Sequence, residues 1–184
     1  MGLFYFDVEA EGEDPQQDRL ITIQFQALTE DLRPVGPFTV LTEWEWGEKE
    51  MVRSFLSRGV FDETWDFVPV GNRLHFDLTF LMERAQRHRL REWGLADLRR
   101  FWFAKPMIDL GTVFVLMNRG KFEGSSISAF AEKRSSAEVP MLHRQGKREE
   151  ILAYVAQEKD ATLALLSELR SLLTAFGDRK RRPP

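Results

Sequence analysis

The stretch "LFYFDVEA", Leu3–Ala10, decides the fold because it reads as a buried strand that carries two acids. Aromatic and β-branched residues are typical of strands, and successive side chains of a strand point to opposite faces. Its apolar residues at even positions therefore share one face, while Asp7 and Glu9 share the other. This spacing predicts a pair of carboxylates on one side of a sheet, although the exposed rim of a strand alternates in the same way.

Three more runs read as strands. The runs "RLITIQFQAL", Arg19–Leu28, and "PFTVLTEW", Pro37–Trp44, follow the first one closely, so we expect an antiparallel meander of three strands. A fourth strand, "DFVPVGN" at Asp66–Asn72, comes after a helix and leads into another helix. That alternation predicts that the fourth strand runs parallel to the first.

Helical periodicity accounts for much of the remaining chain. The expected helices are Glu48–Gly59, Phe76–Leu90, Leu95–Phe103, Asp109–Gly120, Ser125–Arg134 and a long one from about Arg148 to Phe176. A short fifth strand is expected within "KPMID", Lys105–Asp109. We therefore expect an α/β fold, a mixed sheet flanked by helices, in a single domain over residues 1–176 with a basic tail over 177–184.

Composition excludes several classes of site. The chain has no cysteine and only three scattered histidines, so disulfides, thiolate zinc sites and cysteine nucleophiles are excluded, and any metal is expected on carboxylates. No apolar run is long enough to span a bilayer, and the first residues lack the pattern of a signal peptide, so we expect a cytoplasmic protein with no membrane partner. Residues 1–66 are strongly acidic and residues 67–147 are basic, which permits an anionic partner but equally describes solvated helix faces.

The last predicted helix carries an acid where an apolar residue is expected. At about 100° per residue, Glu158 lies about 20° from Ile151, near the middle of the apolar stripe, whereas Asp160 points the opposite way. A carboxylate that faces a core must be paired, hydrogen-bonded, protonated or bound to a metal. Tyr154 lies four residues earlier on the same face, where a packing role and a role beside a metal are both open.

A fourth acid, Asp77, lies at the start of the helix that follows the fourth strand, and its helical position faces the packed side. An acid in a first helical turn is common because it complements the helix dipole. Together with Asp7, Glu9 and Glu158, however, it would make four inward carboxylates that repel one another. Divalent cations such as Mg²⁺ or Mn²⁺ resolve that conflict, and two of them can support in-line displacement at a phosphodiester.

These residues carry a family resemblance. "FDVEAEG" with Asp7 and Glu9, "VGNRLHFDLTFL" with Asn72 and Asp77, and "YVAQE" with Tyr154 and Glu158 resemble the three motifs of the DEDD-type 3′-to-5′ exonucleases, tyrosine branch, in the ribonuclease H-like superfamily. The likeness is to the exonuclease domain of family B DNA polymerases and its free-standing relatives. It spans about Leu3 to Leu169, and it departs at Glu158, where the family has aspartate.

The resemblance implies a catalytic set and its cofactors. Asp7 would bridge two Mg²⁺ or Mn²⁺ ions, Glu9 and Glu158 would complete the site of the ion that activates water, and Asp77 would support the other ion. Tyr154 would position the nucleophile, Asn72 would hold the second motif or contact substrate, and Phe76 could stack on an unpaired base.

Two functions follow as hypotheses. The first is a metal-dependent exonuclease that hydrolyses phosphodiester bonds at 3′ ends of nucleic acid, preferably single-stranded or unpaired DNA. The second is a non-catalytic nucleic-acid-binding or scaffold domain that retains the fold. Four inward acids without a metal would bring repulsion and no benefit to packing, which favours the first.

Overall fold

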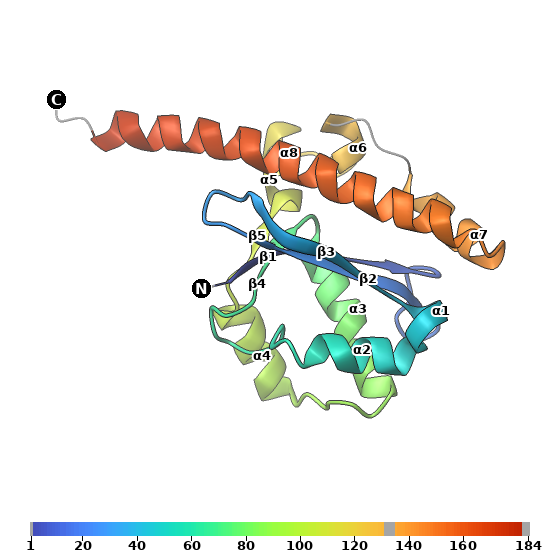
Figure 1. The fold of residues 1–184 in the computed structure, drawn as a ribbon. Coiled ribbons are helices and arrows are strands. Elements are labelled where there is room, and N and C mark those ends of the chain that lie inside the picture. The colour runs from blue at the N-terminus through green and yellow to red at the C-terminus, as the bar shows by residue number, and fades with distance from the viewer. Residues whose placement is uncertain (1, 131–134, 182–184) are drawn as a thin grey trace.

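A five-stranded mixed sheet forms the centre of the computed structural model, which describes residues 2–130 and 135–181 (Figure 1). The strand order is β3-β2-β1-β4-β5. The strands are β1 Leu3–Ala10, β2 Leu20–Leu28, β3 Pro34–Thr42, β4 Val68–Gly71 and β5 Ile108–Asp109. The first three form the predicted antiparallel meander, and β4 pairs in parallel with both β1 and β5. The predicted mixed sheet is thereby confirmed, with the acid-bearing strand β1 at its centre.

Helices cover both faces of the sheet (Figure 1). They are α1 Glu43–Trp46, α2 Glu48–Leu56, α3 Leu74–Arg87, α4 Leu95–Ala104, α5 Leu110–Met117, α6 Ile127–Phe130, α7 Val139–Arg144 and α8 Arg148–Arg181, with a 3₁₀ turn at Ser136–Glu138. Helices α2, α3 and α4 lie below the sheet in this view, and α5, α6 and α8 lie above it. The sheet is therefore the middle of three layers.

Successive side chains of β1 point to opposite faces of the sheet, so its apolar residues contribute to two separate cores, one against each helical layer. Phe6 and Val8 pack toward α2 and α3, where the Phe6 ring stacks on that of Phe55 at 5.1 Å between centroids. Leu3 and Tyr5 pack on the other face, in a cluster with residues of α5, α6 and α8. The acids of β1 share this second face, so they point toward α8 as the spacing predicted.

Helix α8 differs from its predicted extent. It continues five residues past Phe176, so residues 177–181 of the predicted tail are helical, and residues 182–184 lie outside the described part. Its apolar stripe is buried at Ile151 and at Leu166, yet Leu173 is 67 % exposed. The periodicity thus predicted the helix correctly, but the body of the protein covers only its first half.

Two short elements were not predicted. Helix α1 takes up the end of the expected third strand, since Glu43 and Trp44 are helical. Helix α7 precedes α8, and its His143 bonds Glu43 of α1 through Nε2 at 2.7 Å. Both elements have four to six residues, too few for periodicity to reveal. Within the described residues, no helix combines the length and the apolar character that a membrane crossing requires.

Candidate metal centre

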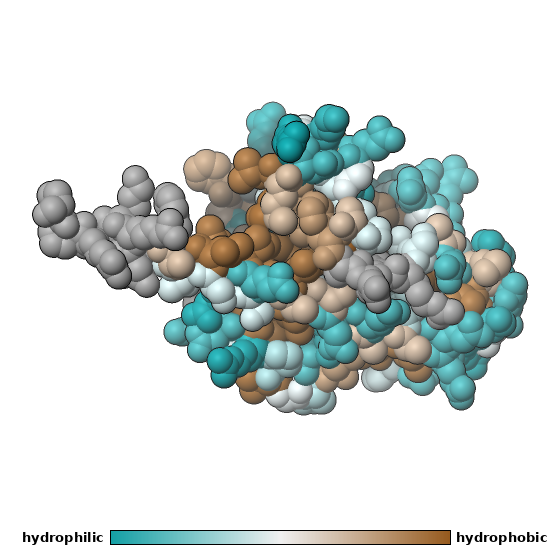
Figure 2. All heavy atoms as spheres, turned by 90° about the horizontal axis from the view of Figure 1, so that it is seen from above, coloured by the Kyte–Doolittle hydropathy of each residue, from teal (hydrophilic) through white to brown (hydrophobic). Residues whose placement is uncertain are grey.

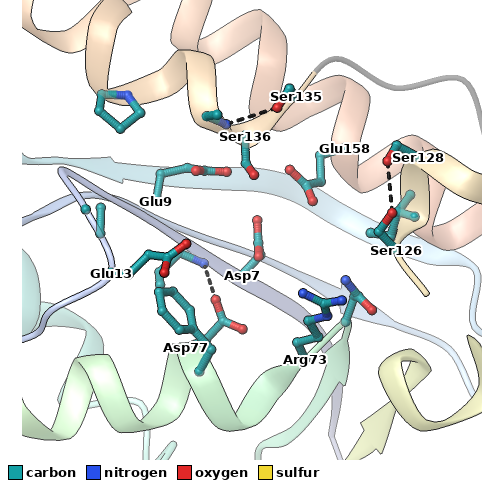
Figure 3. A pocket seen from close by; sticks show the side chains of 18 residues that line it. Asp7, Glu9, Glu13, Arg73, Asp77, Ser126, Ser128, Ser135, Ser136 and Glu158 are labelled. Carbon is teal, nitrogen blue, oxygen red and sulfur yellow. Dashed lines mark hydrogen bonds between the residues drawn. The ribbon is translucent and has the colours of Figure 1, made fainter. Parts of the chain in front are cut away.

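Three carboxylates from opposite ends of the chain meet above β1. Asp7, Glu9 and Glu158 each offer an oxygen, and these oxygens all lie within 4.8 Å of one another. The first two come from alternate positions of β1, and Glu158 reaches down from α8 (Figure 3). The structure therefore brings together three of the four predicted metal ligands in a geometry that one cation can bridge.

Glu158 occupies the inward position that the helical periodicity predicted. The residue is 7 % exposed, and its Oε2 accepts a hydrogen bond of 2.5 Å from the hydroxyl of Tyr154. Asp160 instead has a side chain that is 73 % exposed and pairs with Lys159 at 2.9 Å. The choice of Glu158 over Asp160 as the inward acid is confirmed.

Asp7 is held by the neighbouring strand. Its cross-strand partner is Gln24, whose Nε2 donates to Oδ2 of Asp7 at 2.7 Å. The Oε1 of Gln24 in turn accepts a bond of 2.9 Å from the hydroxyl of Thr22. This chain of bonds fixes the amide of Gln24 with its NH₂ toward the carboxylate, so one oxygen of Asp7 has a set orientation.

Asp77 lies next to the trio without belonging to it. The residue is 3 % exposed in the first turn of α3, and its Oδ1 accepts the backbone N–H of Val8 at 3.2 Å. Burial, and then the charge of Asp7, raise the pKa of Asp77 well above its ordinary value. Its predicted role as a metal ligand stays a prediction, and what the structure shows is a buried acid that ties α3 to β1.

A pocket of about 680 Å³ opens over the acids. Its walls include Asn72 and Phe76, the two residues predicted to contact substrate. Oδ1 of Asn72 is buried and has no hydrogen-bond partner among the described residues, and Phe76 is 43 % exposed. Phe76 is therefore placed to meet a molecule that enters the pocket, whereas Oδ1 of Asn72 is covered by the protein.

Among the described residues, Tyr154 is not one of those that line this pocket. It is 1 % exposed and packs in a cluster with residues of α7 and α8. Its hydroxyl reaches the site through Glu158, so its visible role is to orient that carboxylate. Its predicted role beside the attacking water stays a prediction.

Several residues of the site were missed by the sequence reasoning. Gln24 gave a signal, because it is a polar residue in the middle of an apolar strand. The other residues of the pocket walls gave no signal in the sequence, since they come from turns and short helices. They include Glu13 and Arg73, and the serines Ser126, Ser128, Ser135 and Ser136.

The electrostatics of the site favour a bound cation. Burial is the main cause of a raised pKa at the hydroxyls of Tyr5 and Tyr154, and the neighbouring carboxylates raise both further. The trio concentrates negative charge in a partly desolvated space, where like charges repel strongly. Oxygen ligands at this spacing suit Mg²⁺, Mn²⁺ or a similar divalent ion, so the residues present fit a metal.

Solved structures share this fold. A structure of E. coli exonuclease I in complex with a dT13 oligonucleotide matches with a TM-score of 0.60 and 14 % identity, over 97 % of this chain and 43 % of that one. The family B DNA polymerase of the hyperthermophilic archaeon Pyrobaculum calidifontis matches with a TM-score of 0.62 and 18 % identity, over 92 % of this chain and 24 % of that one. A zinc-bound form of the E. coli ExoI–ssDNA complex matches with a TM-score of 0.59 and 15 % identity, over 97 % of this chain and 42 % of that one.

These likenesses confirm the fold of the DEDD-type exonucleases for this chain. The chain spans less than half the length of each of these structures. No protein-family model matches the sequence, and no curated protein does.

Proposed function

We propose that this chain is a divalent-metal-dependent 3′-to-5′ exonuclease that acts on single-stranded or unpaired DNA ends. The observation that carries the proposal is the meeting of Asp7, Glu9 and Glu158, whose oxygens lie within 4.8 Å of one another and which all line one pocket. A packed domain without a cation gains nothing from three close carboxylates. Support also comes from the shared fold, since the exonuclease I structures were solved with DNA oligonucleotides.

The trio would hold the first divalent ion, and Asp7 with Asp77 would hold a second. Bound there, such ions supply Lewis acidity toward a phosphoryl oxygen and lower the pKa of bound water. The chain provides the rigidity that this chemistry needs. Gln24 orients Asp7 and Tyr154 orients Glu158, so two ligands have hydrogen-bonded support behind them.

Other residues of the pocket would position the substrate. Asn72 lines the pocket with a partly exposed side chain, and a small rotation of its amide would offer a hydrogen bond to a sugar hydroxyl. Phe76 presents an exposed ring beside the acids, which suits the face of an unpaired base. Bases are accessible for such stacking in single strands and frayed ends, which is why we assign that substrate class.

The test is hydrolysis of 5′-labelled single-stranded, duplex and mismatched DNA, and of RNA, with Mg²⁺ or Mn²⁺. We expect a ladder that shortens from the 3′ end, release of mononucleotides, and loss of activity with a chelator. Asp7→Asn should abolish the ladder, and Asp160→Asn, which removes an equal charge on the exposed face, should leave it unchanged. Cleavage of a closed circle, or full activity of Asp7→Asn, would contradict the proposal.

A further inference from the structure

An ordered loop joins α5 to α6 at the edge of the pocket, and we call residues 118–126 the Phe122 loop. The side-chain amide of Asn118 donates to the carbonyl oxygens of Lys121 at 3.1 Å and Glu123 at 2.8 Å. The hydroxyl of Ser125 is buried and donates to the carbonyl oxygen of Lys121 at 2.6 Å. Since its own side chains hold its backbone, the loop presents its exposed residues in fixed positions.

Phe122 is 70 % exposed on this loop. A single exposed aromatic residue is not unusual in itself. Here, however, the guanidinium carbon of Arg73 lies 5.3 Å from the centroid of the Phe122 ring, and Arg73 also lines the pocket. The guanidinium group of Arg73 therefore connects the exposed ring of Phe122 to the wall of the candidate active site.

Arg73 is held through its backbone and through its side chain. Its backbone N–H donates to Oδ1 of Asp109 at 2.7 Å, and its φ of 57° turns the chain into α3. Its Nη2 donates to the carbonyl oxygen of Ser125 at 3.0 Å. Of these two bonds only the one to Ser125 uses the guanidinium fork, which leaves further donors for a phosphate.

The two ends of the pocket differ in charge. Arg73 lies on the side of Ser126 and Ser128, whereas Glu13 lies on the other side of Asp7 (Figure 3). The Phe122 loop adds two exposed cations, Arg119 and Lys121, against one exposed acid, Glu123. A phosphate-bearing strand is therefore attracted at the Arg73 end and repelled at the Glu13 end.

From this arrangement we infer that Arg73 and the Phe122 loop bind the nucleotide that lies on the 5′ side of the one removed. The inference rests on the proposed function. Arg73 contacts the phosphate of this nucleotide, and Phe122 stacks on its base. The combination of an aromatic face and a cation beside it is typical of sequence-independent binding to single strands. The terminal nucleotide then lies toward Glu13, over the carboxylate trio.

The test compares Phe122→Ala with Phe103→Ala, which removes an equally large ring that is 94 % exposed on α4, away from the pocket walls. Binding of a 5′-fluorescein oligothymidine of about ten nucleotides is measured by anisotropy, and binding of thymidine 5′-monophosphate by its competition with that strand, with Ca²⁺ in place of Mg²⁺. Phe122→Ala should weaken binding of the longer strand about 5- to 100-fold. It should leave binding of thymidine 5′-monophosphate unaffected, because this ligand has no nucleotide on the 5′ side, and Phe122→Trp should restore affinity for the longer strand.

Arg73→Gln gives a second, independent readout. Loss of one phosphate contact should reduce the slope of log affinity against log salt by about 0.7 for a single strand. Phe103→Ala should keep the wild-type slope. Thermal melting of all four variants checks that the fold is intact, as expected for substitutions of exposed side chains.

Two results overturn the inference alone while the wild-type protein still degrades DNA. One is equal affinity of Phe122→Ala and Phe103→Ala for the longer strand, and the other is an equal loss of affinity for the longer strand and for thymidine 5′-monophosphate. A wild-type protein that neither binds nor degrades any oligonucleotide overturns the proposed function together with this inference. The two failures are therefore distinguishable.

Discussion

Glu158 is one methylene longer than the aspartate that the resembling family has at this position, and its carboxylate still reaches Asp7 and Glu9. Glu158→Gln keeps the shape of the side chain and removes its charge. We expect more than about a 100-fold loss of activity, because even residues that only support a ligand cost about 10- to 100-fold. Steady-state hydrolysis and Mn²⁺ titration measure the effect. The exposed Asp160→Asn is the matched control, and reversal of the order of the two variants would move the ligand assignment to Asp160.

A variant of Tyr154 can separate the effect of orienting Glu158 from the effect of losing Glu158 as a metal ligand. Tyr154→Phe removes only the hydroxyl that donates to Glu158. We expect a loss of about 10- to 100-fold in metal affinity or activity, smaller than that of Glu158→Gln. Excess Mn²⁺ should recover part of the activity if the hydroxyl acts through Glu158. A loss of turnover that no metal concentration relieves would indicate a direct role beside the nucleophile.

Lys105, which lies away from the metal centre, should make the stability of the protein depend on pH. Its ammonium group is buried at the end of α4 and donates to the carbonyl oxygen of Asp62 at 2.7 Å. Burial lowers its pKa from 10.5 to about 8. Between these pH values the unfolded chain binds the proton that the folded chain has released, so this residue makes the free energy of unfolding rise from pH 8 to 10.5. Urea unfolding across that range should show a smaller rise for Lys105→Met, and an equal rise in both proteins would exclude this assignment.

At the scale of elements, a buried ion pair joins α2 to α3. Glu48 accepts from Nε of Arg84 at 2.7 Å and from Nη2 at 2.6 Å, and both residues are nearly fully buried. Arg84 also donates to the carbonyl oxygen of Pro15, in the loop that carries Glu13 into the pocket. The pair therefore fixes a wall of the site from the opposite layer.

Breaking this pair on one side should be costly. Arg84→Met leaves the buried carboxylate of Glu48 without its main counter-charge, and we expect a loss of about 3–5 kcal/mol in the free energy of unfolding. Glu48→Gln retains an acceptor for the N–H of Leu20, with which Glu48 bonds at 2.9 Å. The double variant should thus be more stable than Arg84→Met alone. Urea unfolding of the three variants measures the coupling, and strictly additive losses would show that the two charges do not interact.

The elements also show what a sequence can reveal. Strand β1, the meander and the inward face of α8 follow from periods of two and 3.6 residues, so Asp7, Glu9 and Glu158 could be predicted together. Tyr154 and the turn that carries Asp77 followed from the same periods. The walls could not be predicted, because Arg73 owes its place to a bond with Asp109 that is made across the sheet, not along the chain. Tertiary contacts of this kind leave no local pattern.

For the whole molecule, metal binding should appear as stability. A cation that binds only the folded chain stabilises it by about 2.7 kcal/mol at 100 times its Kd. Thermal unfolding should therefore shift upward with millimolar Mn²⁺ in the wild type, and much less in Asp7→Asn. A non-catalytic scaffold that has lost the metal site would melt at the same temperature with Mn²⁺ and with a chelator.

The exposed end of α8 should contribute little to that stability. Leu172 and Leu173 are 69 % and 67 % exposed, and apolar side chains gather on this face of the molecule beside the end of the helix (Figure 2). Replacing both leucines by glutamine should change the free energy of unfolding by less than about 0.5 kcal/mol, as for most surface positions. Leu166→Ala, about two turns earlier and buried, should cost about 2–5 kcal/mol. Comparable losses in the two variants would mean that the far end of α8 is covered in solution.

The route of the chain also decides when the carboxylate trio can exist during synthesis. Asp7 and Glu9 leave the ribosome some 150 residues before Glu158, which joins them only after α8 has docked across the sheet. A nascent chain that still lacks α8 can form the strands and yet has no complete set of acids. If the protein hydrolyses nucleic acid through this trio, that capacity arises only once α8 has docked, so products terminated before Glu158 lack it.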